Sequence, residues 1–102
     1  MKSVLLGAAA SVVLLASGSV AADDIKIGVL YPTSGGGAIY GAPAMVGHEL
    51  AIEEINAAGG INIGGKAHMV ELVSYDNEYA PDKARTGAQK LIHEDGVKFI
   101  MM

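Results

Sequence analysis

Two glycine-rich stretches of this chain have spacings close to those of phosphate-binding loops, but neither matches the full pattern of such a loop. Residues 60–67 satisfy G-x-x-x-x-G-K, but Ala67 stands where such a loop needs a Ser or Thr for Mg²⁺. That stretch also follows an expected helix and precedes an expected strand, the reverse of a phosphate loop. When G-x-G-x-x-G is aligned on Gly35 and Gly37, Tyr40 takes the place of the third glycine. We therefore expect no nucleotide and no other cofactor.

The histidines and paired acids do not form a catalytic or metal-binding pattern either. His48 lacks a second histidine at the spacing of a zinc protease, and His68 and His93 fall in separate expected elements. Asp76 and Glu78 do not fit a calcium loop, and paired acids without a positioned partner are usually a solvated turn. The sequence predicts no catalytic residue, no metal site and no enzymatic activity.

The first 22 residues are typical of a cleaved export signal. A positive start at Met1 and Lys2 precedes an apolar core over residues 4–16, and small residues follow over 17–22. An uncleaved membrane anchor is the alternative, but the apolar part is short for a bilayer. We expect a signal peptide over residues 1–22 and one truncated domain over 23–102. The chain has 102 residues, no cysteine and a formal net charge of −4, which argues against lipid attachment, disulfides and a nucleic-acid partner.

The elements that would position any site alternate between strand and helix. We expect strands over residues 25–31, 67–75 and 97–102, helices over 42–58 and 81–95, and loops over 32–40, 59–65 and 76–80. This β-α-β-α-β order predicts an α/β fold with a parallel sheet. Ligands of such sheets bind beyond the carboxyl ends of the strands. The loops over 32–40 and 76–80 are therefore the candidate site.

The helix over residues 42–58 carries a stripe of mostly small residues. At 100° per residue the stripe consists of Ala44, Gly47, Ala51, Ile52, Ile55 and Ala58. Such a face suits a helix that lies close against a sheet, and Gly59 and Gly60 can end the helix in left-handed geometry. His48 falls within this face, and we expect it at the edge of the stripe with its nitrogens turned outward.

The order of several motifs resembles one family. Gly-x-Leu-Tyr-Pro-Thr-Ser-Gly over residues 28–35 is followed by Tyr40-Gly41, then by E-L-A-I-E-E-I-N-A-A-G-G-I over 49–61, and then by Val70-Glu71-Leu72 leading to Tyr75-Asp76. This order resembles the start of a type I periplasmic solute-binding protein, nearest to the branched-chain amino acid (Leu/Ile/Val) binding proteins of ABC importers. The resemblance implies a two-lobed fold of which this chain supplies the first β-α-β-α-β portion of lobe one.

The resemblance also implies a ligand site and a function. In the family, Ser-Gly and Tyr-Gly elements of the first loop border the ligand, which places Ser34 and Tyr40 at the ligand site. From the residues alone, Ser34 could equally cap a turn and Tyr40 could pack under the loop. The implied function is capture of a branched-chain amino acid in the periplasm by lobe closure, and delivery to ABC permease membrane subunits.

The resemblance leaves other ligands and roles open, and the length of the family's proteins leads to an expectation about this chain. Its members also bind amides, urea or aromatic acids, and the same fold serves in ligand-sensing or regulatory periplasmic domains. Because the family's proteins are several times longer, we expect this chain to be an incomplete fragment. These 102 residues alone are expected to be marginally folded at best and to bind no leucine measurably.

Overall fold

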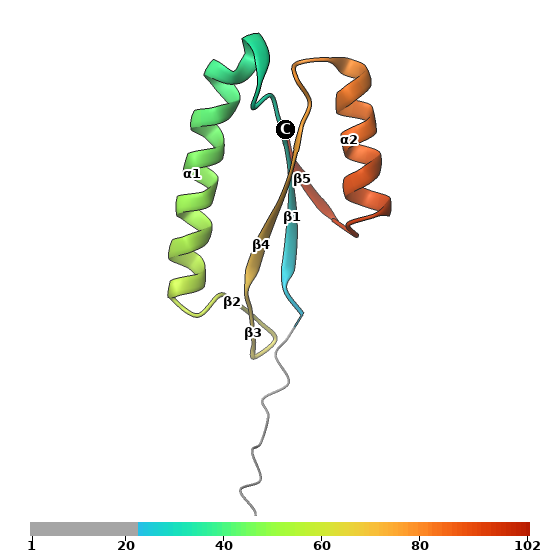
Figure 1. Cartoon of the computed structure of the whole chain (residues 1–102). Helices are drawn as coiled ribbons and strands as arrows, with labels where there is room; N and C mark the ends of the chain where they lie inside the picture. The colour runs from blue at the N-terminus through green and yellow to red at the C-terminus, as the bar shows by residue number, and fades with distance from the viewer. Residues whose placement is uncertain (1–22) are drawn as a thin grey trace, which may run out of the picture.

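A computed structural model describes residues 23–102, and the expected signal peptide lies outside the described residues. Within them the chain forms β-strands, α-helices and one short 3₁₀ helix in the order shown in Figure 1. The elements are β1 (Ile25–Tyr31), η1 (Gly35–Gly37), α1 (Ala38–Ala57), β2 (Ile61–Ile63), β3 (Lys66–His68), β4 (Val70–Asp76), α2 (Pro81–His93) and β5 (Phe99–Met101).

The main sheet is parallel, as the alternating pattern predicts, and has the order β4-β1-β5. The first strand therefore lies in the middle. It pairs with β4 from Ile25 opposite Val70 to Tyr31 opposite Asp76, and with β5 from Ile27 opposite Phe99. Because β1 and β4 end in step, the loops that follow them lie at the same edge of the sheet.

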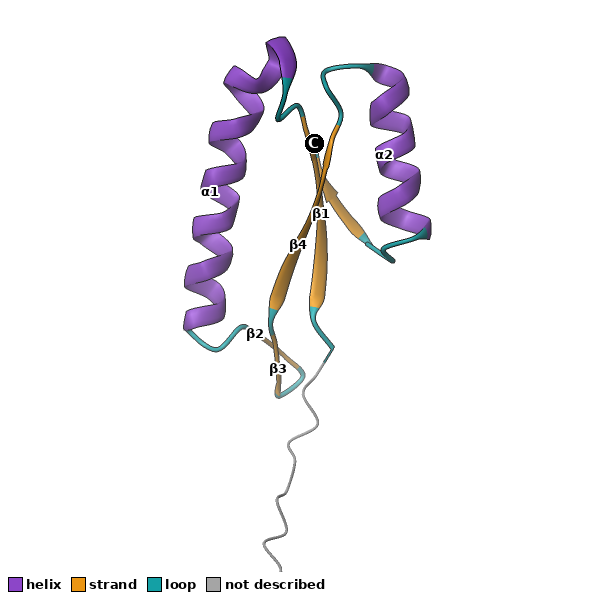
Figure 2. Ribbon diagram, viewed as in Figure 1, coloured by secondary structure: helices purple, strands orange, loops and turns teal. Residues whose placement is uncertain are grey.

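The two long helices cover opposite faces of this sheet (Figure 2). On the α2 face the buried core consists of Leu30, Leu91 and Val97, surrounded by partly buried residues of β4, α2 and β5. Gly28 allows the close approach, since a Cβ there would lie 2.9 Å from Cγ1 of Val97. The apolar side chains of this layer follow the period of two along the strands.

The face that α1 turns to the sheet differs from the predicted one. Its buried and half-buried residues are Ala38, Gly41, Ala44, Met45, His48, Ile52, Ile55 and Asn56, whereas Gly47, Ala51 and Ala58 are exposed. The prediction counted small residues and placed polar ones outside. The true face is rotated because two polar side chains, His48 and Asn56, have partners on the sheet.

Both of those polar side chains bond across the layer. The His48 ring stacks on Tyr31 with 5.4 Å between ring centroids, and its Nε2 lies 3.3 Å from the Tyr31 hydroxyl. The expectation that His48 turns its nitrogens outward is therefore wrong. Asn56 Nδ2 donates to the carbonyl of Val70, and Asn56 Oδ1 accepts from the amide of Val70, both at 2.8 Å. This clamp fixes the end of α1 against the start of β4.

Several element bounds also differ from the expected ones. Helix α1 begins at Ala38, because η1 leads directly into it, and residues 32–40 are not all loop. The expected strand over 67–75 is split: β2 and β3 form a separate antiparallel hairpin around Gly64 and Gly65, which have φ of 60° and 83°. The glycine stop of α1 is confirmed, with φ of 102° at Gly59 and 86° at Gly60.

Candidate functional site

The candidate site is the carboxyl edge of the sheet, formed by the loop over residues 32–37 after β1 and the loop over 77–80 after β4. Figure 2 shows both loops at the end of the sheet where α1 and α2 begin. The pairing of Tyr31 with Asp76 brings the two loops together. This is the place where ligands of parallel sheets bind, as the sequence predicts.

Asp76 joins the two loops through its carboxylate. Its Oδ1 accepts from the amide of Thr33 at 2.9 Å, and its Oδ2 accepts from the Ser34 hydroxyl at 2.5 Å. These bonds, that of Ser34 first, stabilise the ionised form and lower the pKa of Asp76 below its ordinary value. The interpretation of this acid as part of a solvated turn is therefore incomplete, because it bonds the neighbouring loop.

The loop after β4 makes a tight turn with unusual backbone geometry. Glu78 and Tyr79 both have left-handed conformations, with φ of 47° and 59°. For residues other than glycine each such conformation costs about 1–2 kcal/mol. The turn is held by two side chains: Asp76 Oδ1 accepts from the amide of Glu78 at 2.8 Å, and Asn77 Oδ1 accepts from that of Tyr79 at 2.9 Å. Asn77 also donates from Nδ2 to the carbonyl of Leu30 at 3.2 Å.

Tyr40 and Ser34, the two expected ligand contacts, both lie at this edge. Tyr40 is in the first turn of α1 and is 76% exposed, so it does not pack under the loop. Ser34 is exposed and precedes η1 without capping it through its side chain. Its hydroxyl hydrogen is donated to Asp76, which leaves the oxygen free to accept. Contact of either residue with a ligand stays a prediction.

The start of α1 is fixed by close packing against Pro32. A Cβ on Gly37 would lie 2.9 Å from Cβ of Pro32 and 3.0 Å from Cβ of Tyr79. A Cβ on Gly41 would overlap the carbonyl oxygen of Pro32. Only glycine fits at these positions without moving the backbone. The two contacts hold the turn that carries Tyr40.

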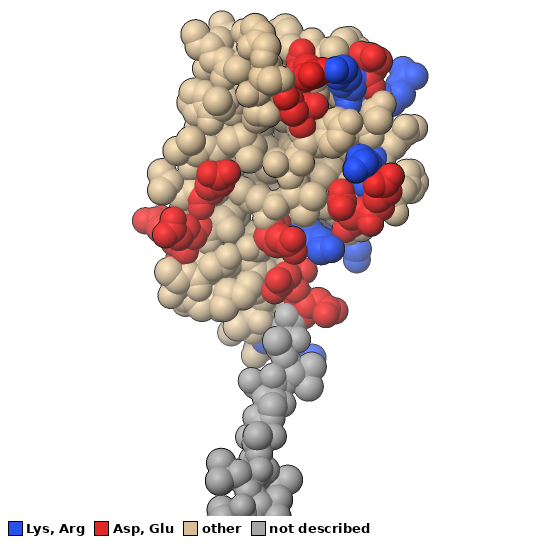
Figure 3. Space-filling view, in the orientation of Figure 1, with Lys and Arg blue, Asp and Glu red and all other residues tan. Residues whose placement is uncertain are grey.

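The acids of the candidate edge are Asp76, at the end of β4, and Glu78, in the loop that follows. Among the described residues, the loops over 32–37 and 77–80 contain no lysine or arginine. Glu78 forms an exposed ion pair with Lys83 of α2. Figure 3 shows acidic groups alone over α1 and both acidic and basic groups over the α2 side, and the three glutamates of α1 (Glu49, Glu53 and Glu54) lie in its C-terminal half, away from this edge. The two loops thus offer no lysine or arginine to a phosphate.

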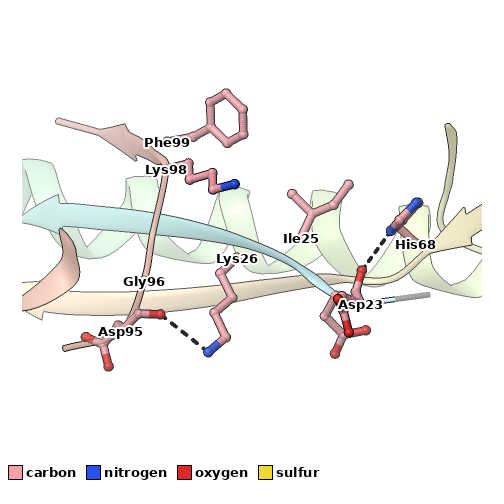
Figure 4. Close-up of a pocket in the computed structure, with 9 residues that line it drawn as sticks. Asp23, Ile25, Lys26, His68, Asp95, Gly96, Lys98 and Phe99 are labelled. Carbon is pink, nitrogen blue, oxygen red and sulfur yellow. Dashed lines mark hydrogen bonds between the residues drawn. The ribbon is translucent and has the colours of Figure 1, made fainter. Parts of the chain in front are cut away.

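A hollow of about 500 Å³ lies at the opposite end of the sheet (Figure 4). Its lining includes Phe99 and charged side chains that already bond to the backbone. Lys26 Nζ donates to the carbonyl of Asp95 at 3.4 Å, and His68 Nδ1 lies 2.7 Å from the carbonyl of Asp23. The hollow lies where β1 and β5 begin, so it is remote from the candidate loops at the other end of the sheet.

The described residues hold neither a cluster of candidate metal ligands nor a helix able to cross a membrane. Within residues 23–102, no cluster of three or more His, Cys, Asp or Glu side chains could hold a metal ion. No helix in the same range is both long and apolar enough to cross a membrane.

Sequence reasoning missed two residues at this edge, Asp76 and Tyr79. Asp76 had a usable signal: it is the last residue of β4, and a carboxylate there faces any hydroxyl that follows the neighbouring strand. For Tyr79 the local signal was Asp76-Asn77, because Asp and Asn side chains bond the backbone two residues further on and favour a tight turn.

Comparison with known proteins identifies one family. The model of the family described as "Periplasmic binding protein" matches residues 24–102. The chain is similar to the Leucine-, isoleucine-, valine-, threonine-, and alanine-binding protein of Pseudomonas aeruginosa, with 42% identity over 94% of this chain and 24% of the relative. It is also similar to the Leu/Ile/Val-binding protein of Escherichia coli K12, with 36% identity over 91% of this chain and 24% of the relative.

Solved structures agree with this result. The branched-chain amino acid transporter substrate binding protein LivJ of Streptococcus pneumoniae, in complex with isoleucine, superposes with a TM-score of 0.67 and 38% identity, over 76% of this chain and 21% of that protein. A solute binding protein of an ABC transporter from Rhodopseudomonas palustris, in complex with 3,4-dihydroxy benzoic acid, gives a TM-score of 0.55 and 27% identity, over 76% and 20%. The chain thus spans about a quarter of the length of the curated relatives it matches.

Proposed function

Because this chain belongs to the periplasmic binding protein family, in its branched-chain amino acid (Leu/Ile/Val) group, we propose that it serves as the solute-binding component of an ABC importer. The solute is a branched-chain amino acid or a similar small molecule, which the protein captures in the periplasm and delivers to the permease membrane subunits. Capture occurs by closure of a second lobe onto the carboxyl edge, without covalent chemistry. Two observations carry this proposal: the match of residues 24–102 to the periplasmic binding protein family, and the 42% identity to an amino-acid-binding protein of Pseudomonas aeruginosa.

The chemistry of the carboxyl edge supports an amino acid as the solute. The exposed ring of Tyr40 is able to cover an aliphatic side chain. The Ser34 oxygen is left as an acceptor because its hydrogen is donated to Asp76. An acceptor beside a carboxylate favours a donor-bearing head group such as an ammonium. An aliphatic amino acid supplies both parts.

One of the similar solved structures favours a second class of solute. The Rhodopseudomonas palustris protein was solved with 3,4-dihydroxy benzoic acid, an aromatic acid without an ammonium group. An aromatic ring of such a ligand can stack on an exposed tyrosine. Aromatic acids are therefore the alternative to branched-chain amino acids at this site.

Isothermal titration calorimetry on the protein as its gene encodes it tests the proposal. Leucine, isoleucine and valine are expected to bind with a Kd of about 1 μM, a binding free energy of about −8 kcal/mol, while 3,4-dihydroxy benzoic acid gives no heat. Binding of the aromatic acid without leucine would replace the proposed solute class. If none of these solutes binds, the proposed function is refuted.

The 102 residues tested alone should behave differently. Lobe closure needs a second lobe, and the described residues supply one parallel sheet, a short hairpin and two long helices. A chain of these residues is expected to bind leucine too weakly for calorimetry. Micromolar leucine binding together with cooperative melting of this chain would contradict the requirement for a second lobe.

A further inference from the structure

Tyr79 stands out at the carboxyl edge because a left-handed backbone carries a large side chain that is mostly exposed. The residue has a left-handed φ of 59°, which glycine adopts freely and tyrosine does not. Its side chain is nevertheless 78% exposed, so the ring contributes little to the described core. Strained backbone of this kind clusters at ligand sites, where the surrounding structure holds it in place.

The strained turn is strongly held. Asn77 is central, since its Oδ1 accepts from the amide of Tyr79 and its Nδ2 donates to the carbonyl of Leu30 in β1. The carbonyl of Asn77 accepts from the amide of Ala80 at 2.8 Å. Asp76 adds a bond from the amide of Glu78. These bonds fix the direction in which the Tyr79 side chain leaves the loop.

The backbone of Tyr79 lies next to the turn that leads to Tyr40. A Cβ on Gly37 would lie 3.0 Å from Cβ of Tyr79, so the two loops are in contact at this point. Tyr40 follows Gly37 by one helical turn and is 76% exposed. One tyrosine from the first turn of α1 and one from the loop after β4 therefore leave the same edge from neighbouring backbone positions. Each ring combines an apolar body with a polar tip.

We propose that Tyr79 is a specificity-determining ligand contact, which forms with Tyr40 two aromatic walls around the side chain of the bound solute. This inference rests on the proposed function and adds a residue and a selectivity to it. Two large apolar walls give more contact to a long aliphatic side chain than to a methyl group, because the gain grows with the apolar area buried. Tyr79 should thus raise the preference for leucine over alanine.

The test compares two variants of Tyr79 in the protein as its gene encodes it. Tyr79→Gly removes the ring and suits the left-handed backbone, so the turn is retained. Tyr79→Phe keeps the ring and removes only the hydroxyl. Tyr31→Phe is the matched control, because the Tyr31 side chain is occupied by His48 of α1, on which its ring stacks. Leucine and alanine are titrated into each protein by calorimetry.

We expect Tyr79→Gly to weaken leucine binding about 10-fold and alanine binding less than about 3-fold. Tyr79→Phe and Tyr31→Phe should keep the leucine affinity within about 3-fold of that of the unchanged protein. Equal weakening of leucine and alanine by Tyr79→Gly would mean a purely structural role and overturn the inference. Unchanged leucine binding by that variant would overturn it as well, while the proposed function would stand. If the unchanged protein binds neither amino acid, both are overturned.

Discussion

Replacing Asn56 by Asp should destabilise the protein in a way that acid reverses. Asn56 Nδ2 donates to the carbonyl of Val70 while Oδ1 accepts from its amide, both at 2.8 Å, and Val70 is only 4% exposed. An ionised carboxylate can accept from the amide but cannot donate to the carbonyl. A protonated carboxyl can do both, since it has one donor and one acceptor.

The size of the effect follows from the two bonds. A neutral hydrogen bond contributes about 0.5–1.5 kcal/mol, and a buried polar group left without a partner costs about 1–3 kcal/mol. The new charge would also lie at the negative end of α1, which adds about 0.3–1 kcal/mol. We therefore expect Asn56→Asp to lower the free energy of unfolding by about 2–3 kcal/mol at neutral pH.

The stability deficit of Asn56→Asp depends on pH. The folded state favours the protonated form of the new carboxyl, so its pKa is raised on folding. A raised pKa gives stability that is present below the unfolded value and is lost as the pH rises through the folded value. The deficit of Asn56→Asp relative to the unchanged protein should thus shrink by about 1 kcal/mol or more between about pH 7 and about pH 4.

Urea denaturation at both pH values measures this deficit. Asn56→Ala is the control: it loses both bonds, costs about 1–3 kcal/mol and adds no titrating group, so its deficit should not change with pH. Taking differences from the unchanged protein removes the pH dependence of every other group. A deficit of Asn56→Asp that is the same at both pH values, or a loss below about 0.5 kcal/mol in Asn56→Ala, would refute the account of the clamp.

Further predictions concern the carboxyl edge and α1. Gly41→Ala should cost about 3 kcal/mol or more of unfolding free energy in urea, because its Cβ would overlap the carbonyl of Pro32, whereas Gly47→Ala, with open space around it, should stabilise the same helix by about 0.5–1 kcal/mol; equal effects would contradict this packing. Asp76→Asn should make stability less sensitive to acid: the lowered pKa of Asp76 gives stability present above its unfolded value and lost as the pH falls through its folded value. Identical acid unfolding of the two proteins would argue against that role. Ser34→Ala should reduce the same acid sensitivity in part, since the Ser34 bond is the main cause of the lowered pKa.

The architecture could be predicted from the sequence because its signals are local. Alternation of strand and helix patterns over residues 25–93 indicates a parallel sheet, and the structure confirms it. The Gly59-Gly60 stop also depends only on backbone freedom. The match to the periplasmic binding protein family confirms the resemblance that the ordered motifs carry. The signal peptide and the roles of Ser34 and Tyr40 as ligand contacts stay predictions.

The remaining features depend on partners far away in the sequence. The sheet-facing side of α1 differs from the predicted stripe because His48 and Asn56 are polar by type, yet each has its partner on a strand. The link from Asp76 to Ser34 requires the register of two parallel strands, which no tight turn specifies. Tyr79 adopts its conformation only because Asn77 is fixed against β1.

The central position of β1 has a consequence for how the chain folds. Ile25–Tyr31 is the first of the described strands to be synthesised, but its neighbours in the sheet are β4 and β5. Ile25 therefore cannot pair until Val70 has been made, and Ile27 cannot pair until Phe99 has been made. Closing such long loops comes before any gain from pairing, which slows folding. Apolar residues of β1 that end almost fully buried, such as Val29 and Leu30, remain open to other partners until then. The central strand β1 is therefore also the segment that most needs protection from wrong contacts while the chain is unfolded.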